Sequence, residues 1–354
     1  MKVGIAGAGL LGRLVALDLI DRGIEVVLVD GDTYNGKDSC GYAGAGMLAP
    51  FSELGSAEPL IHQMGVDSLP IWKDISRSFE TPIFFQDEGS LIVAHPSDRN
   101  ELDALHGRIM RRLPSPIGVE WVDRAGIQQL EPQLDSRFNR AIYLPFEGQV
   151  SSRAFFEAST LKLRKHTQWH ANTPIKSVTP QKIQTQNSAF HVDIAIDCRG
   201  LAGRQYFPQL RGVRGELLRI HAPDVHINRP VRLMHPRYPL YVVPRPDQIY
   251  LVGATMIESD DMSPITAQSA MELLSAAFSL HVGFAEGRIL EQVVHCRPAL
   301  PDNLPQVQIA AGLATANGLY RHGYLIGPAL AKSIGEWVQH QSSDHYPQIF
   351  KVCT

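Results

Sequence analysis

Three glycines near the N-terminus constrain the fold of this chain more than any other feature. Residues 2–6 form a short apolar run, residues 7–12 read Gly-Ala-Gly-Leu-Leu-Gly, and residues 10–22 carry apolar side chains at helical spacing. Gly23 stands where a helix C-cap is expected, and residues 25–29 form a second, β-branched run. The pattern predicts a strand, a tight turn, a helix and a second strand, which together make a βαβ unit.

The glycines and one acidic residue of this unit match the requirements of a dinucleotide site. Gly7 allows the tight turn, Gly9 lets the backbone approach a pyrophosphate, and Gly12 lets the helix pack closely on the strand. The helix N-terminus then faces the phosphates. Asp30 follows Gly12 by 18 residues (30 − 12), about where a carboxylate accepts hydrogen bonds from an adenosine ribose. A turn that serves packing alone is the alternative, and the fingerprint does not distinguish a nicotinamide from a flavin dinucleotide.

Composition limits the classes of partner. The length of 354 residues predicts two domains, and 44% hydrophobic with 19% charged residues is typical of a soluble globular protein. The net charge of −3 gives no excess positive field for nucleic acid or an anionic membrane, and no apolar run reaches the roughly 18 residues that a membrane span needs. The four cysteines form no CxxC pair, which favours a reducing compartment. We therefore expect a cytoplasmic protein with small-molecule partners and without a nucleic-acid or membrane partner.

A second cluster of small residues follows the βαβ unit. Residues 39–50 read Ser-Cys-Gly-Tyr-Ala-Gly-Ala-Gly-Met-Leu-Ala-Pro. Small side chains let the backbone lie against a flat ligand, although a loop packed under a helix has the same composition. Further distinctive segments are Leu-Glu-Pro at 130–132, Val-Arg-Gly-Glu at 213–216, Tyr-Val-Val-Pro-Arg at 241–245, Gly-Ala-Thr-Met at 253–256, Arg-Pro at 297–298 with Asp-Asn-Leu-Pro at 302–305, and Gly-Leu-Tyr-Arg-His-Gly-Tyr-Leu at 318–325.

In this order the segments resemble those of glycine oxidases, members of the D-amino acid oxidase family of flavoproteins, which includes the thiazole-forming oxidase of thiamine biosynthesis. The resemblance implies FAD as the cofactor and an α/β fold. In that fold a Rossmann-like FAD-binding domain carries an inserted antiparallel-sheet α+β substrate domain, as in D-amino acid oxidase and glutathione reductase. The FAD-binding domain is expected at 1–80, 145–210 and 295–354, and the substrate domain at 81–144 and 211–294.

Residue patterns predict the elements around these motifs. Strands are expected at 89–95, 118–123, 141–144, 194–196 and 214–220, and helices at 98–112, 155–164 and 330–338. Pro236, Pro239, Pro244 and Pro246 are expected to bracket another strand pair. The polar tail from residue 340 gives no indication of structure.

By resemblance, FAD is bound non-covalently by several separate segments. The implied FAD-binding residues are Gly7, Gly9, Leu10, Leu11, Gly12, Asp30, Gly31, Cys40, Gly41, Ala45, Gly46, Met47, Ile175, Gly200, Leu319, Tyr320, Arg321, His322, Gly323, Tyr324 and Leu325. Three departures from the family pattern concern this site. Ser39 is the nearest serine or threonine to Gly41, where the family has a hydroxyl for the flavin diphosphate. Asp30 replaces a glutamate, and His322 replaces an asparagine and brings a titratable group toward the flavin.

Oxidation of an amino acid at its α-carbon requires a clamp for the carboxylate, and arginine suits this role because its planar guanidinium forms two charge-assisted hydrogen bonds. The resemblance implies that Arg297 holds the carboxylate with the Tyr241 hydroxyl and that Arg321 lies beside the substrate. These three are the expected catalytic residues, and with Met256 they form the expected substrate site. Met47 and Met256 are implied to line an apolar wall. The structural alternatives are surface ion pairs for the arginines, a plain strand position for the tyrosine and core packing for the methionines.

Two other chemistries concern cysteine and histidine. Some related amine oxidases tether flavin to a cysteine in the region of Cys296, but a buried thiol is the expected state of this residue. His166 and His170 stand four residues apart, yet this segment is expected to pass from a helix into a strand, and no third ligand is evident. No metal site is expected.

The resemblance implies FAD-dependent oxidation of glycine or another small amine to the imine. Water then gives glyoxylate and ammonia, and molecular oxygen is reduced to hydrogen peroxide. No general base is needed, because an oriented neutral amine can release its α-hydrogen as hydride. A homo-oligomer and transfer of the imine to a thiazole synthase are compatible with the sequence. The alternatives are a D-amino acid or sarcosine oxidase, a quinone-dependent dehydrogenase, a flavin-binding protein without catalysis, and a tRNA-modifying flavoprotein, against which the near-neutral charge argues.

Overall fold

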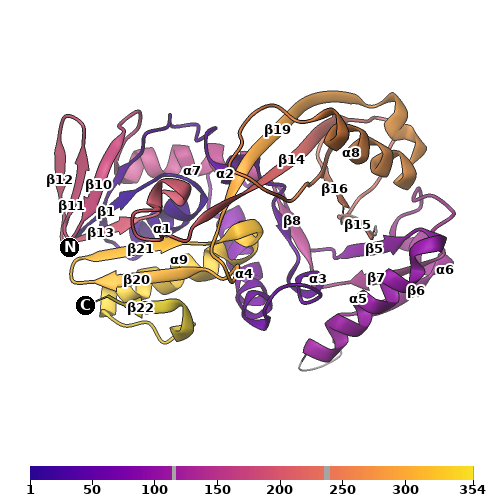
Figure 1. Cartoon of the computed structure of the whole chain (residues 1–354), viewed down its shortest axis with the longest axis horizontal. Helices are drawn as coiled ribbons and strands as arrows, with labels where there is room; N and C mark the ends of the chain where they lie inside the picture. The colour runs from indigo at the N-terminus through magenta and orange to yellow at the C-terminus, as the bar shows by residue number, and fades with distance from the viewer. Residues whose placement is uncertain (114–116, 235–239, 354) are drawn as a thin grey trace.

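The computed structural model describes residues 1–113, 117–234 and 240–353, which form two lobes (Figure 1). One lobe, on the left of Figure 1, holds a seven-stranded sheet and both chain termini. Its strands, in spatial order, are β22 (Phe350–Val352), β20 (Gln306–Ala310), β21 (Leu313–Asn317), β13 (Ile194–Asp197), β1 (Lys2–Ala6), β2 (Glu25–Val29) and β9 (Gln168–His170). The strands from β21 to β9 are parallel to one another, and β20 is antiparallel to β21.

Side chains of the central strands alternate between two apolar layers. Val3, Ile5 and Leu28 face helices, whereas Val27 and Val29 face a small second sheet. The helices on the first face are α1 (Leu10–Asp21), α4 (Pro59–Arg77), α7 (Ser152–His166) and α9 (Gly323–His340). The sheet on the second face consists of β10 (Ile175–Thr179), β11 (Lys182–Thr185) and β12 (Ala189–His191). Because both faces are covered, these strands are apolar throughout, as parallel strands require.

The other lobe is built on a nine-stranded, largely antiparallel sheet (Figure 1). Its strands are β18 (Ile257–Glu258), β14 (Arg211–His221), β17 (Ile249–Gly253), β16 (Leu240–Arg245), β15 (Val231–Met234), β5 (Ser90–Ala94), β7 (Arg140–Leu144) and β6 (Glu120–Asp123), with β19 (Arg288–Ala299) paired to β14. Helices α5 (Arg99–Arg112), α6 (Arg124–Leu130) and α8 (Ala267–Leu280) pack on it. The long β14–β19 pair reaches from this sheet toward the first lobe.

The remaining elements are short. A small sheet joins β3 (Met47–Leu48), β8 (Gly148–Val150) and β4 (Phe85–Gln86). The short helices are α2 (Cys40–Ala43), α3 (Pro50–Glu53), η1 (Pro96–Asp98), η2 (Gly200–Gly203), η3 (Val282–Glu286), η4 (Tyr320–His322) and η5 (Pro347–Ile349).

The helices and strands predicted with residue ranges are confirmed, and apart from the start of the final helix their ends agree within three residues. The final helix begins earlier than predicted, because α9 starts at Gly323. Pro244 lies inside β16 instead of beside it, while Pro236 and Pro239 fall outside the described residues. The tail contains β22, which pairs with β20 and was not predicted. The domain limits remain a prediction. Strand β19 crosses the predicted limit between residues 294 and 295.

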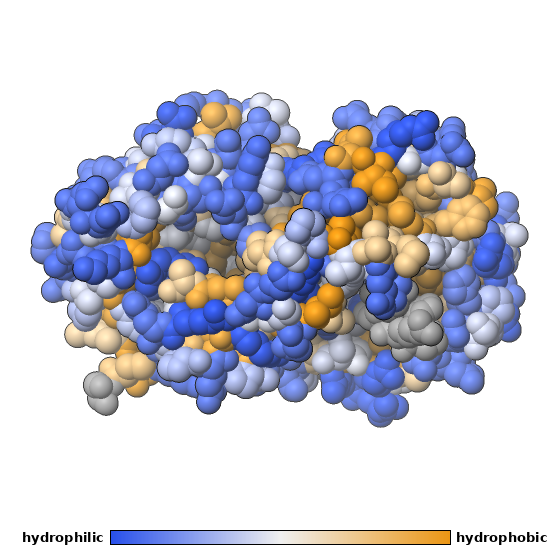
Figure 2. Space-filling view, turned by 45° about the horizontal axis from the view of Figure 1, so that its top comes forward, coloured by the Kyte–Doolittle hydropathy of each residue, from blue (hydrophilic) through white to orange (hydrophobic). Residues whose placement is uncertain are grey.

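Apolar side chains gather on the outside of the second lobe, over β19 and α8 (Figure 2). The exposed ones there include Met271, Phe278, Ile289 and Leu290. In the described part of the chain, no helix is both long and apolar enough to cross a membrane.

Candidate active site

A cavity of about 580 Å³ extends from the turn after β1 to the strands of the nine-stranded sheet. All the residues predicted to bind FAD or substrate line it except Gly12. These lining residues are Gly7, Gly9, Leu10, Leu11, Asp30, Gly31, Cys40, Gly41, Ala45, Gly46, Met47, Ile175, Gly200, Tyr241, Met256, Arg297, Leu319, Tyr320, Arg321, His322, Gly323, Tyr324 and Leu325. The fold therefore brings together in one cavity residues from both ends of the sequence.

The glycine turn has the geometry that a pyrophosphate site requires. Gly7 adopts a φ of +97°, which L side chains rarely adopt. A Cβ on Gly12 would lie 1.8 Å from the Gly7 carbonyl oxygen, so this residue acts through packing of α1 against the turn. Helix α1 begins at Leu10, and its N-cap Gly9 has no capping side chain. The first N–H groups of the helix can therefore bind the diphosphate of FAD.

Two polar side chains beside this turn, Asp30 and Ser39, are held in place by hydrogen bonds from backbone N–H groups. The Asp30 carboxylate accepts hydrogen bonds from the N–H groups of Ala8 and, at 2.6 Å, Asp32. Its contact with the ribose stays a prediction. The Ser39 hydroxyl accepts a hydrogen bond from Gly41 N–H at 3.1 Å and lines the cavity, and a Cβ on Gly9 would lie 3.0 Å from it. Ser39 thus offers a hydroxyl beside the glycine turn.

Arg13 was not predicted by the sequence patterns, and it lies directly behind the turn. Its guanidinium is fully buried and donates to the carbonyl oxygens of Ala8 (2.7 Å), Tyr34 (2.8 Å) and Phe156 (2.9 Å). Burial lowers the pKa of Arg13 to about 10, so the group is charged at neutral pH. A positive charge behind a diphosphate site favours the bound anion.

At the opposite end of the cavity, Arg297 projects from β19 over the neighbouring strand β14. Its Nη1 donates to the Thr255 carbonyl oxygen at 3.1 Å. No carboxylate of the described residues forms an ion pair with this guanidinium, so its charge is available for a ligand. Burial raises the pKa of Tyr241, which lines the same region on β16, so its hydroxyl stays protonated and can donate.

Gly215 on β14 provides the surface on which the Arg297 guanidinium lies. A Cβ at this position would be 2.3 Å from Arg297 Nη2. Because that atom belongs to a flexible side-chain end, Gly215→Ala is expected to fold and bind FAD but to displace the guanidinium. We expect KM for the substrate to rise about tenfold or more, since small misplacements of a positioning group are costly. Steady-state kinetics test this, and the substitution should have no further effect when Arg297 is alanine.

Arg321 is engaged in an ion pair that the sequence did not predict. Its Nη2 and Nε lie 2.6 and 3.1 Å from Oε2 of Glu53, at the end of α3, and its Nη1 lies 3.3 Å from the sulfur of Met256. The other carboxylate oxygen, Oε1, is 3.8 Å from Nη1 of Arg232 on β15. The role of Arg321 in substrate binding stays a prediction. No sequence pattern marked Glu53 or Arg232, since neither lies in a recognised motif.

His322 is buried at the start of α9, and its Nδ1 lies 3.6 Å from Glu53 Oε2. Burial, opposed by the Glu53 charge, lowers the pKa of His322 to about 4. The imidazole is therefore neutral above that pH. We expect His322→Asn to leave the shape of the kcat/KM profile unchanged between about pH 5.5 and 8. Loss of an inflection near pH 6 to 7 in the variant would contradict this assignment.

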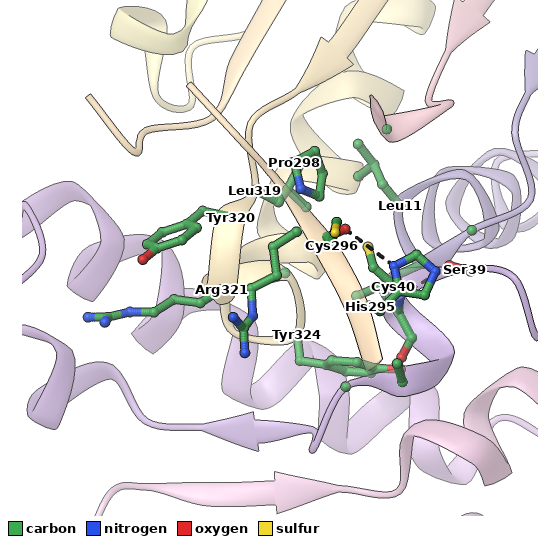
Figure 3. A pocket seen from close by; sticks show the side chains of 18 of the residues that line it. Leu11, Ser39, Cys40, His295, Cys296, Pro298, Leu319, Tyr320, Arg321 and Tyr324 are labelled. Atoms are coloured by element: carbon green, nitrogen blue, oxygen red, sulfur yellow. Dashed lines mark hydrogen bonds between the residues drawn. The ribbon is translucent and has the colours of Figure 1, made fainter. Parts of the chain in front are cut away.

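A further group of polar side chains surrounds the middle of the cavity. Figure 3 shows Ser39, Cys40 and His295 gathered on one side and Tyr320 and Arg321 on the other. His295 Nε2 lies 2.8 Å from the Asp38 carbonyl oxygen. Burial raises the pKa of Cys40 to about 11, so its thiol is protonated at neutral pH.

The histidine pair at residues 166 and 170 is divided as predicted. His166 ends α7 and His170 ends β9. Within residues 1–113, 117–234 and 240–353, no group of three or more His, Cys, Asp or Glu side chains could hold a metal ion.

The chain is similar in sequence to known proteins over nearly its whole length. The family model described as FAD dependent oxidoreductase (DAO) matches residues 2–337. A protein of Rhizobium etli that carries the name thiamine biosynthesis oxidoreductase ThiO is 39% identical over 334 residues, covering 94% of this chain and 95% of that protein. The bifunctional protein ThiO/ThiG of Trichormus variabilis is 25% identical, and the match covers 96% of this chain and 53% of that protein.

Solved structures agree with the fold. Glycine oxidase from Geobacillus kaustophilus matches with a TM-score of 0.82 at 22% identity, and the match covers 98% of this chain and 97% of that one. The expected arrangement, a Rossmann-like FAD-binding fold with a second antiparallel sheet, is thereby confirmed. The family match spans most of the chain, and the glycine turn has the geometry for a dinucleotide. The chain therefore belongs to the DAO family of FAD-dependent oxidoreductases.

Proposed function

We propose that this enzyme oxidises glycine or a similarly small primary or secondary amine to the imine, with molecular oxygen as the electron acceptor. The observation that carries the proposal is the unpaired guanidinium of Arg297. Its guanidinium lies in the cavity without a carboxylate partner among the described residues, and it donates to the neutral Thr255 carbonyl oxygen. A half-buried guanidinium of this kind is suited to a substrate carboxylate.

A few of the lining residues have distinct parts in the proposed reaction. When bound, FAD supplies the two-electron acceptor. Arg297 and the protonated Tyr241 hydroxyl would hold the carboxylate, which fixes the direction of the α-hydrogen. Met47 and Tyr241 pack with an apolar cluster that includes Leu217 and Ala254, and this cluster limits access of water. Hydrolysis of the imine gives glyoxylate and ammonia, and the two electrons and two protons removed from the amine reduce oxygen to hydrogen peroxide.

We further propose that FAD is held without a covalent bond. Burial raises the pKa of Cys296, and its thiol contacts the carbonyl oxygens of Ser259 at 3.5 Å and Asp261 at 3.7 Å. A thiol in this state is a poor nucleophile. Acid precipitation should therefore leave the yellow flavin in solution, and flavin that precipitates with the protein would contradict the proposal.

A cytoplasmic location and transfer of the imine to a thiazole-forming partner belong to the same proposal. The name of the Rhizobium relative, which refers to thiamine biosynthesis, supports the second point. A homo-oligomer stays a prediction. The exposed apolar side chains over β19 and α8 could contact a second copy of the chain, but they are equally compatible with another partner.

Product analysis tests the proposed reaction. Purified holoenzyme is supplied in air with glycine, sarcosine or D-alanine, and oxygen uptake, hydrogen peroxide, glyoxylate or pyruvate, and ammonia or methylamine are measured. The proposal predicts equal amounts of peroxide and keto acid, with glycine or sarcosine oxidised most efficiently. Reduction of an artificial dye without peroxide would indicate a dehydrogenase instead. If no amine in the panel is oxidised, the proposed function is wrong.

A further inference from the structure

We infer that Glu53 is a specificity-determining residue, an internal counter-ion that restricts the substrate site to amines with one carboxylate. The inference rests on the proposed function and concerns the arginines of the same cavity. Arg232, Arg297 and Arg321 all line it, and Glu53 lines it between two of them.

The ion pairs of Glu53 occupy two of these three arginines. Its Oε2 is 2.6 Å from Arg321 Nη2, and its Oε1 is 3.8 Å from Arg232 Nη1. The three side chains are only 14–19% exposed. Burial alone would raise the pKa of the Glu53 carboxyl, but the positive charge of Arg321, with His322 and Arg232 nearby, lowers it to about 2. Glu53 is therefore ionised throughout the neutral range.

This arrangement leaves one arginine for the substrate. Three guanidinium groups and one carboxylate give a local charge of +2 (3 − 1), and Arg297 is the member of the set without a carboxylate partner in the described chain. A second substrate carboxylate directed toward Arg321 or Arg232 would meet the negative charge of Glu53. Repulsion of this kind, in a poorly solvated site, is an effective means of rejecting a competing ligand. Glu53 thus fills the place that a second substrate carboxylate would take.

A neighbouring carboxyl, Glu147, does not change this balance. It lies behind Glu53, where it accepts hydrogen bonds from Ser52 N–H at 2.6 Å and from the Ser90 hydroxyl. Burial raises its pKa to about 7, so it carries only part of a negative charge at neutral pH. It is not among the residues that line the cavity.

The test compares two ethers without an amine, methoxyacetate with one carboxylate and diglycolate with two. Their dissociation constants are measured by titrating the visible spectrum of the flavin in the holoenzyme. The wild type should prefer methoxyacetate. Glu53→Gln keeps the size of the side chain but leaves Arg321 and Arg232 without a counter-ion, so the preference should move toward diglycolate by about 100-fold. The ratio of kcat/KM for glycine and iminodiacetate should move in the same direction.

Controls separate this effect from general disturbance. Glu58→Gln makes the same change five residues away at an exposed site and should leave the ratio unchanged. A Glu53→Gln holoenzyme with normal flavin content and a ratio within threefold of the wild type would overturn the inference. If Glu53→Gln does not retain flavin, the same titrations are made with Arg321→Gln. Diglycolate binding should then weaken at least tenfold relative to methoxyacetate binding. An unchanged ratio of the two dissociation constants overturns the inference. The titrations involve no turnover, so they remain decisive even if glycine is not a substrate.

Discussion

Replacing Arg297 by methionine is expected to lower kcat/KM for glycine by about 10²–10³-fold, because loss of one partner of a charged contact that the bound substrate desolvates costs about 2–5 kcal/mol. Methionine is unbranched and apolar, so it can fill the space over Gly215 that the Arg297 guanidinium now takes. The flavin content should stay normal, since the glycine turn that holds the diphosphate is at the other end of the cavity. Steady-state kinetics together with the visible spectrum measure both quantities.

The matched control is Arg288→Met, which makes the same replacement at an exposed position of the same strand, β19. It should leave kinetics with glycine unchanged. A small amine without a carboxylate, such as ethylamine, provides a second control, because its slow oxidation should be affected little by the loss of Arg297. If Arg297→Met retains flavin and oxidises glycine with wild-type constants, the carboxylate clamp is elsewhere.

Gly12→Ala is expected to yield a protein that holds almost no FAD. The added Cβ would lie 1.8 Å from the Gly7 carbonyl oxygen, and neither atom belongs to a flexible side chain. Helix α1 must therefore move away from β1, which displaces the N–H groups that face the diphosphate. We expect flavin content below about one tenth of the wild type and a loss of about 2–3 kcal/mol in the free energy of unfolding. Absorbance after purification and denaturant unfolding measure the two effects.

Gly107→Ala is the matched control for this substitution. Gly107 also lies in a helix, α5, and its added Cβ would approach only Arg111 Nη1, at 3.4 Å. Alanine favours the helix there, so stability should be unchanged or slightly higher and FAD content normal. A Gly12→Ala protein with a full complement of FAD would show that the close approach of α1 to the turn is not required.

The sequence was sufficient for features determined by neighbouring residues. The strands predicted at 2–6 and 25–29 appear as β1 and β2 with those bounds. Their apolar patterns and the intervening glycines are local properties, and each has a direct physical reading. The prediction that Tyr241 and Arg297 lie in one cavity came from family resemblance, because nothing in their local sequence indicates that β16 and β19 both border that cavity.

Features that depend on distant contacts could not be predicted. Glu53 belongs to a four-residue helix, and its partner Arg321 is 268 residues away. Arg13 reads as an ordinary polar position of an amphipathic helix, and its burial depends on Phe156, 143 residues further along. Strand β22 is a short segment of a polar tail that becomes ordered because β20 offers it an edge. Ionic partners and sheet edges are set by the tertiary fold, which local periodicity does not encode.

Anaerobic titration of the purified yellow protein with glycine shows whether this site oxidises a small amine. We expect glycine to bleach the visible flavin spectrum without oxygen, and we expect admitted air to restore it with formation of one equivalent of hydrogen peroxide. The Arg297→Met protein should bleach far more slowly at the same glycine concentration. A flavin spectrum that excess glycine and sarcosine leave unchanged would mean that the protein is not a small-amine oxidase, although the fold and the FAD site would stand.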